Sequence, residues 1–274
     1  MDYKKLLSPT VMGIKPSGIR KFFDIANTME DVISLGVGEP DFPTPWEIRK
    51  AGILSLEGGK TRYTSNRGLE VLREEIGNYV KRKYGVTYDP VSEILVTVGG
   101  SEAIDACIRA IASPGDEIII PQPSYVCYEP ITALCGCKPV IIETKAENSF
   151  KLTAKELKAA ITPRTKALIL PYPNNPTGGV MTREQLIAIA QELMDTDIIV
   201  ISDEIYCCLV YDKQEFTSFA SLGEEVKERT ILIDGFSSPD TGRLGICPRD
   251  FFVKYTRVCT TIRICKSQYC SDGK

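Results

Sequence analysis

The chain has 274 residues, 43% of them apolar and 25% charged, a composition typical of soluble globular proteins. Its formal net charge of −3 offers no basic surface for nucleic acid or an acidic membrane, and no apolar run approaches the roughly 18 residues of a membrane span. The absence of histidine excludes Ser-His and Cys-His catalytic pairs and His-rich metal sites. We therefore expect no nucleic-acid partner, no membrane partner and no metal. Because residues 1–23 lack the apolar centre of a signal peptide, we expect a cytoplasmic protein.

The N-terminal part of the chain differs from the rest. Residues 1–45 hold a basic segment, then a strand-like stretch and a loop rich in Pro and Gly. Residues 46–59 and 68–85 have the apolar spacing of amphipathic helices, and a polar loop joins them. We expect these helices to expose apolar patches and to lower the solubility of the chain.

From about residue 93, strand and helix patterns alternate. The strand cores are apolar at consecutive positions, which indicates burial on both faces, as in a mostly parallel sheet covered by helices. The predicted fold class is α/β, with three layers in the order α/β/α. Strands are predicted at 93–100, 116–121, 138–144, 166–173, 197–206 and 230–237, and helices at 101–112, 124–136, 153–161 and 182–196.

Most cysteines in the predicted elements have an apolar setting. Cys107, Cys127, Cys207 and Cys208 lie in apolar runs, so we expect small buried hydrophobic residues there. Other cysteines show no zinc-ligand spacing, and disulfides are not expected in a cytosolic chain.

Polar residues follow the first two predicted strands. Gly99, Gly100 and Ser101 separate a strand from a helix, where free backbone N–H groups and the helix dipole favour an anion. Tyr125 lies at the next strand-to-helix junction, where its ring is suited to stack on a planar cofactor. An ordinary glycine turn and a packing tyrosine are the alternatives at these two places.

Two later strands also end in polar residues. The rigid turn at 171–179 contains Asn175, whose amide can donate to a phenolate-type oxygen. Asp203 ends an apolar strand, so a buried carboxylate is expected there, and such a group needs a partner. A protonated pyridine nitrogen is one such partner, and Tyr206 follows three residues later. A helix-capping role for Asp203 is the alternative.

The motifs VGGSEA, PNNPTG, SDEIY and TGRLG, in this order, resemble the class I/II aminotransferases of fold type I, which use pyridoxal 5′-phosphate (PLP). LGVGEPDF and RYTSNRGLEVLREEI extend the similarity over roughly residues 1–250, nearest to the aspartate and aromatic branch. The resemblance implies amino group transfer between an amino acid and a 2-oxo acid. It assigns cofactor contacts to Gly100, Ser101, Glu102, Tyr125, Asn175, Asp203, Tyr206, Ser237 and Arg243.

Two further residues complete the family assignment. Gly38 corresponds to a contact of the substrate carboxylate, and Tyr63 to a tyrosine that reaches the phosphate in the neighbouring subunit. That second role implies a homodimer with shared active sites.

The family pattern fails after the last predicted strand. The Schiff-base lysine is expected at Ser238, and the stretch from there to Arg243 is shorter than in the family. A serine hydroxyl cannot replace the lysine amine, because it neither forms the covalent link to PLP nor carries the proton of the substrate. We therefore assign no catalytic residue and expect a chain that is inactive as written.

The remaining residues suggest how the chain is organised. We predict an N-terminal arm and partial small domain at 1–45, a PLP-binding large domain at 46–250, and a tail at 251–274 that does not match the family. The tail has five Lys or Arg residues against one acid, Asp272. We expect the small C-terminal domain to be missing, as after a frameshift.

Three hypotheses follow for the chain. It is an aminotransferase by descent that has lost activity, or an active PLP enzyme that uses another lysine, or a non-catalytic module that binds PLP or a protein partner. Which amino acid is the donor is left open.

Overall fold

Seven strands form one sheet in a computed structural model that describes residues 5–14, 25, 28–29, 43–235 and 259–262. The chain divides into two units, Met1–Pro43 and Thr44–Lys274. The first unit contains α1 (Pro9–Gly13), whose N-terminus is capped by the Ser8 hydroxyl accepting from the Val11 N–H at 3.2 Å. The sheet belongs to the second unit.

The sheet is mostly parallel, as the sequence predicts, and the α/β class is confirmed. The strands are β1 (Ile94–Thr97), β2 (Glu117–Gln122), β3 (Lys138–Glu143), β4 (Thr165–Leu170), β5 (Ile199–Asp203), β6 (Thr230–Gly235) and β7 (Cys259–Ile262). Their order in the sheet is β1-β7-β6-β5-β4-β2-β3. Strands β3, β2, β4, β5 and β6 are parallel to one another, and β7 is antiparallel to both β1 and β6.

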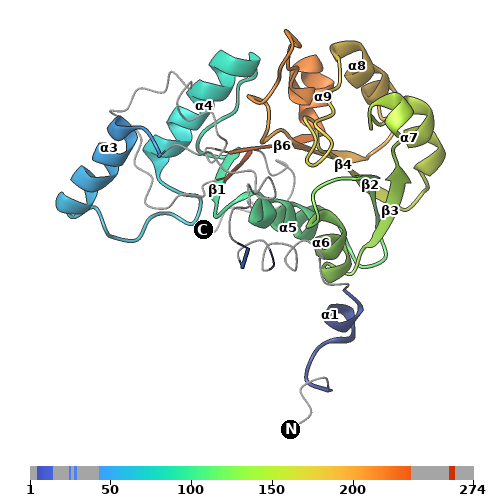
Figure 1. The fold of residues 1–274 in the computed structure, drawn as a ribbon, viewed down its shortest axis with the longest axis horizontal. Helices are drawn as coiled ribbons and strands as arrows, with labels where there is room; N and C mark the ends of the chain where they lie inside the picture. The colour runs from blue at the N-terminus through green and yellow to red at the C-terminus, as the bar shows by residue number, and fades with distance from the viewer. Residues whose placement is uncertain (1–4, 15–24, 26–27, 30–42, 236–258, 263–274) are drawn as a thin grey trace, which may run out of the picture. The chain divides into compact units, whose positions relative to one another are not determined.

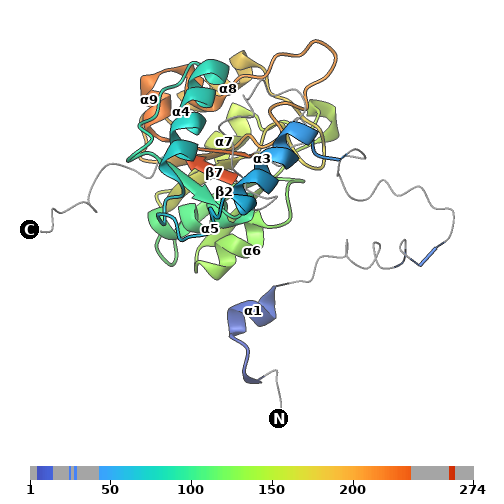
Figure 2. The ribbon, with the colours of Figure 1, turned by 90° about the vertical axis from the view of Figure 1, so that its left-hand side faces the viewer.

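Helices cover both faces of the sheet (Figures 1 and 2). Helices α5 and α6 lie on one face, and α4, α7, α8 and α9 lie on the other. The helical segments of this unit are α3 (Trp46–Glu57), α4 (Glu70–Tyr84), α5 (Gly100–Ile111), α6 (Tyr128–Leu134), η2 (Ala146–Asn148), α7 (Ala154–Ala160), α8 (Arg183–Gln191), η3 (Phe219–Leu222) and α9 (Glu224–Glu228).

The core is split by the sheet because successive side chains of a strand point to opposite faces. In β2, Ile118 and Ile120 pack under α5 and α6, whereas Ile119 packs against α7 and α8. In β6, Leu232 joins the cluster under α4. This double burial explains why the strand sequences are continuously apolar.

Two helices begin at a threonine cap. Thr153 begins α7 and Thr182 begins α8, and each forms a reciprocal capping box with the third residue of its helix, Glu156 and Gln185. Helix α8 ends at Gln191, earlier than the predicted residue 196.

Helix α6 is shorter than predicted at its start. It begins at Tyr128, whereas the sequence pattern placed residues 124–127 in the helix as well. Those residues instead form the turn between β2 and α6, closed by the Tyr128 N–H donating to the Tyr125 carbonyl at 3.3 Å. The correction matters because Tyr125 is a predicted site residue.

The two N-terminal helices of this unit differ in burial. Helix α4 buries Leu72, Ile76 and Val80, so the predicted exposure of apolar residues does not hold for that face. Helix α3 buries only Ser55 and leaves Trp46 and Leu54 more than half exposed, as expected. β7 lies within the tail, for which no strand was predicted.

Candidate functional site

The predicted site residues lie where parallel strands end. Since β2, β4, β5 and β6 run in one direction, their carboxyl ends share one edge, where open α/β sheets bind ligands. β1 runs in the same direction, because β7 is antiparallel to both β1 and β6. The residues that follow these strands therefore line one edge of the sheet.

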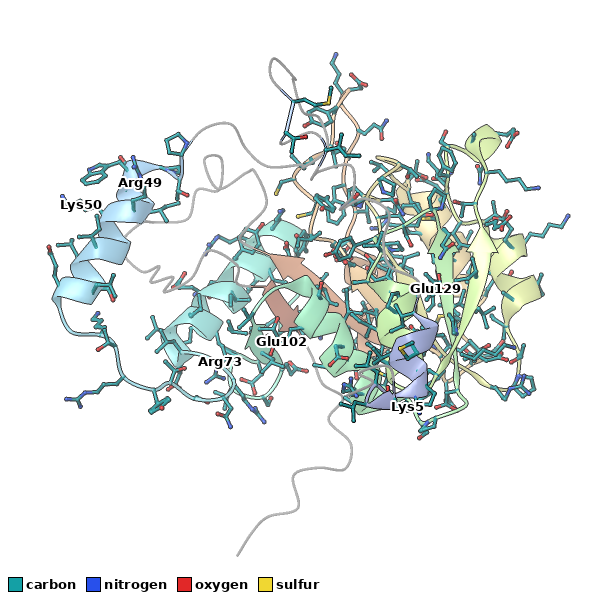
Figure 3. All side chains as sticks on the ribbon, turned by 60° about the horizontal axis from the view of Figure 1, so that its bottom comes forward. Lys5, Arg49, Lys50, Arg73, Glu102 and Glu129 are labelled. Carbon is teal, nitrogen blue, oxygen red and sulfur yellow. The ribbon has the colours of Figure 1, made fainter. Side chains whose placement is uncertain are left out.

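The start of α5 has the character of an anion site. Gly99 precedes the helix with φ of 97°, a backbone conformation that favours glycine. The N–H groups of Gly100, Ser101 and Glu102 find no acceptor within the part of the chain that the structure describes. The Glu102 side chain turns back to accept from the Val98 N–H, and it lies on the first turn of α5 (Figure 3). These backbone groups and the dipole of a 12-residue helix favour a phosphate.

Tyr125, in the turn between β2 and α6, lies next to the start of α5. The Tyr125 hydroxyl lies 3.4 Å from Ser101 Oγ, and its ring packs edge-on against Tyr128 with 5.8 Å between ring centroids. Tyr125 is 39% exposed, so much of its ring is available to a ligand. The structure thus brings together Ser101 and Tyr125, two residues to which the resemblance assigns cofactor contacts.

Asp203 is the buried charge of this edge. Its Oδ2 accepts from the Tyr128 hydroxyl at 2.8 Å, and its Oδ1 accepts from the Ile205 N–H at 3.3 Å. Burial, followed by the charge of Asp234, raises the pKa of Asp203. No Lys or Arg pairs with this carboxylate among the residues described. A buried carboxylate without a cation is a site suited to a protonated ligand nitrogen.

Two adjacent asparagines have different roles. Asn174 Oδ1 accepts from the Thr177 N–H and hydroxyl, which shapes the turn after β4. Asn175 instead donates from Nδ2 to the Tyr206 hydroxyl at 3.0 Å. Burial raises the pKa of Tyr206, and the charges of Asp203 and Tyr125 raise it further, so these groups lie within electrostatic reach.

The sequence of the chain matches a known family. The model of the family "Aminotransferase class I and II" matches residues 30–247. This chain belongs to the class I and II aminotransferases. The family is PLP-dependent, and the aminotransferase and fold-type-I interpretation of the sequence is confirmed.

Curated aminotransferases are similar over most of this chain. A putative aminotransferase, YugH, of Bacillus subtilis is 54% identical over 231 residues, which are 84% of this chain and 59% of YugH. An aspartate aminotransferase of Pyrococcus abyssi is 46% identical over 224 residues, which are 82% of this chain and 57% of that protein. The chain thus spans somewhat more than half the length of these relatives.

Solved aminotransferase structures share the fold. The aspartate aminotransferase of Thermus thermophilus with maleate superposes with a TM-score of 0.81 at 34% identity, covering 93% of this chain and 64% of that one. A structure titled Pyrococcus protein-A1 gives a TM-score of 0.84 at 40% identity, with 92% and 62% covered.

Some predicted aminotransferase residues are not tested by this geometry. Gly38, Ser237, Ser238 and Arg243 lie outside the described residues. Tyr63 is fully exposed between α3 and α4 and makes no hydrogen bond with the described residues. Its proposed role toward a neighbouring subunit stays a prediction.

Sequence reasoning missed Tyr128, the residue that holds Asp203. The signal was present, because Tyr128 lies three residues after Tyr125 in a stretch that the sequence analysis assigned to one helix. A residue spacing alone does not show that its hydroxyl reaches the end of β5, three strands along the chain.

The described residues contain neither a metal-binding cluster nor a membrane-spanning helix. No group of His, Cys, Asp or Glu there has the arrangement of a metal site. No helix in the same residues has the length and apolar character to cross a membrane.

Proposed function

We propose that this chain binds PLP at the carboxyl edge of its sheet and that its parent activity is amino group transfer between an amino acid and a 2-oxo acid. The observation that carries the proposal is Asp203, a buried carboxylate with two hydrogen-bond donors and no cation among the described residues. The polar groups at this edge of the sheet suit the three polar parts of PLP. The free N–H groups of α5 suit the phosphate, Asp203 suits the ring nitrogen, and Asn175 with Tyr206 suit the ring oxygen.

Each side chain has a separate task in this proposal. Asp203 would hold a proton on the ring nitrogen, and Tyr128 would fix the carboxylate in position. The backbone of Gly100, Ser101 and Glu102 would bind the phosphate, assisted by Ser237 and Arg243. Tyr125 would lie against the ring. When bound, PLP supplies an electron sink that stabilises negative charge on the substrate carbon that loses a proton.

The chain lacks the lysine that is expected to transfer the proton of the substrate. Between Ile231 and Val253 the sequence contains no lysine, and Ser238 stands where the family lysine is expected. A positioned general acid or base contributes about 10²–10⁴-fold to a rate, and a serine hydroxyl is a poor proton carrier near neutral pH. We therefore propose that the chain does not catalyse transamination as written.

A non-catalytic PLP-binding role is the second candidate. It is supported by a contrast: Asp203 and Asn175 keep their hydrogen bonds with Tyr128 and Tyr206, whereas Ser238 stands where the family lysine is expected. Further parts of the family assignment are also proposals: the Gly38 contact with the substrate carboxylate, a homodimer completed by Tyr63, and the division into 1–45, 46–250 and 251–274.

Equilibrium dialysis with PLP tests the proposal. The unmodified chain is expected to bind, and Asp203→Asn is expected to bind more weakly, because the neutral amide loses its attraction for a protonated nitrogen. Asp105→Asn is the matched control, since it removes the same charge from an exposed pair with Arg109 on α5. Failure of the unmodified chain to bind PLP would refute the proposal.

A transamination assay separates the two candidates from an active enzyme. We expect no amino group transfer from any common amino acid to a 2-oxo acid. If transfer occurs, borohydride reduction and peptide mapping would locate a lysine linked to PLP, and that result would establish catalysis by another lysine.

A further inference from the structure

Lys83, near the C-terminal end of α4, places its ammonium between two neighbouring cysteine sulfurs. Its Nζ lies 2.9 Å from Cys207 Sγ, 2.7 Å from Cys208 Sγ and 2.5 Å from the Tyr79 hydroxyl. The two sulfurs are 3.7 Å apart. Lys83 forms no salt bridge with a carboxylate among the described residues, so these three atoms are its direct polar partners.

The sequence analysis predicted that Cys207 and Cys208 act as small buried hydrophobic residues. Their contacts with Lys83 differ from that prediction. Cys107 on α5 fits that description, because it packs in the apolar cluster with Ile104 and Ile108, and burial raises its pKa to about 12. Cys207 and Cys208 instead face an ammonium. A thiol sulfur is a weak acceptor, whereas a nearby lysine stabilises a thiolate.

The two sulfurs are not equivalent. Cys207 is buried, and its Sγ also contacts the Tyr84 hydroxyl at 3.1 Å and lies 3.8 Å from Asp234 Oδ1. The contact with Cys208, together with burial and the charge of Asp234, raises the pKa of Cys207. Cys208 is half-buried and closer to the ammonium. Cys208 is therefore the more accessible of the two sulfurs and the one nearer the Lys83 ammonium, so a small oxidant can reach it.

We propose that Cys208 is a peroxide-reactive thiolate and that Lys83 captures the oxidised sulfur as a reversible nitrogen–sulfur cross-link. The oxidant is hydrogen peroxide or another hydroperoxide. Cys207 and Cys208 follow Tyr206 in the chain, but the cross-link uses none of the proposed PLP contacts, so it does not depend on the proposed function.

The chemistry balances in two steps. The thiolate of Cys208 attacks the peroxide, an S–O bond forms, the O–O bond breaks, and the departing hydroxide takes a proton from the Lys83 ammonium. The products are a sulfenic acid, a neutral amine and water. The amine then attacks the sulfur, forming an N–S bond and releasing the oxygen as a second water. Overall, one peroxide is reduced and the sulfur loses two electrons.

The amine is better placed than Cys207 to capture the sulfenic acid. Consecutive Cα atoms lie about 3.8 Å apart across a trans peptide bond, below the about 4.4–6.8 Å usual for a disulfide. A disulfide between Cys207 and Cys208 would therefore be strained, whereas the Lys83 nitrogen already lies against the Cys208 sulfur. The cross-link would fasten the segment after β5 to α4.

Peptide mapping of the whole, reduced chain after treatment with hydrogen peroxide tests the proposal. We expect a peptide containing Lys83 to be joined to the peptide containing Cys208, with the loss of two hydrogen atoms relative to the separate peptides. A thiol reductant is expected to separate them again. Cys107 is expected to remain unmodified in the same digest, because it is buried in an apolar cluster.

Two variants identify the bonded atoms. Cys207→Ser is expected to keep the cross-link, whereas Lys83→Arg is expected to lose it and to leave Cys208 as a sulfenic acid or a more oxidised form. If the unmodified chain forms only a Cys207–Cys208 disulfide, or if Cys208 reacts no faster than Cys107, the proposal is wrong. The mapping of the unmodified chain decides this even if a variant fails to fold.

Discussion

Tyr128 on α6 donates a 2.8 Å hydrogen bond to Asp203 at the end of β5, and both residues are buried. The same relationship occurs on the next strand, where the Tyr84 hydroxyl of α4 donates to Asp234 Oδ2 of β6 at 2.6 Å. Because Asp203 lies on the α5 and α6 side and Asp234 on the α4 side, each face of the sheet supplies one tyrosine to one carboxylate.

Replacing Tyr128 by Phe is expected to weaken both stability and PLP binding. The variant leaves a buried carboxylate with one donor fewer, at a cost of about 1–3 kcal/mol. Since the Tyr128 hydrogen bond lowers the pKa of Asp203, its loss raises that pKa, and the acidic limit of PLP binding moves to higher pH. Urea unfolding and dialysis at several pH values measure the two effects. Tyr211→Phe, an exposed change, is the control.

Glu204 is expected to make the fold less stable as pH rises. Burial raises the pKa of Glu204 from 4.5 to about 8, so the folded state holds a proton that the unfolded state releases. The stabilising contribution of protonated Glu204 is complete below the pKa that this group has in the unfolded chain, and it is lost as pH rises toward 8. The free energy of unfolding then falls by at most about 1.4 kcal/mol per pH unit. Glu204→Gln keeps acceptors for the Ser202 hydroxyl and the Phe219 N–H and should flatten this part of the profile.

The pH profile of the free energy of unfolding, measured by urea titration, checks the prediction for Glu204. The exposed change Glu147→Gln should leave the profile unaltered. An unchanged slope in Glu204→Gln would mean that Glu204 is ionised in the folded chain.

The capping residues Thr153 and Thr182 are each expected to contribute to the free energy of unfolding. Thr153→Ala and Thr182→Ala each remove a hydroxyl that accepts from the third N–H of a helix, at a cost of about 1 kcal/mol. The exposed Thr61, which caps nothing, provides the control substitution. The free energy of unfolding in urea is the measurement, and equal values for all three variants would contradict the capping role.

Gly68 is expected to be intolerant of alanine. Its φ is +91°, and an added Cβ would lie 2.7 Å from the Val96 Cβ of β1, so both strain and a clash oppose the change. The loss should exceed about 1 kcal/mol. Gly59→Ala is the matched control, because Gly59 also has a positive φ of 67° but open space around it. Similar melting temperatures for the two variants would rule out the clash with Val96.

The strands and helix starts were predictable because short stretches of the sequence indicate them. Continuous apolar runs such as Ile118–Ile120 identify strands buried on both faces, and Thr153 and Thr182 mark helix starts through their own hydrogen bonds. Because Asn175 and Asp203 each follow one of these parallel strands, both lie toward the carboxyl ends of the sheet.

Other features depend on contacts between distant residues. The hydroxyl of Tyr128 reaches Asp203, and the amine of Lys83 reaches Cys207 and Cys208, only because of how helices pack on the sheet. An apolar run containing Cys207 and Cys208 predicts burial but not a neighbouring ammonium. β7 was missed for the same reason, since it pairs with β1 from the far end of the chain.

The clustering of buried acids has a spectroscopic consequence. Ordinary carboxyl groups are ionised well below neutral pH. Asp203, Glu204 and Asp234, with raised pKa values, all lie at the ends of β5 and β6. Because the pKa of Glu204 is raised to about 8, an infrared band of protonated carboxyl that persists toward neutral pH would report on Glu204 at this edge of the sheet. That band would follow ligand arrival there without any added label.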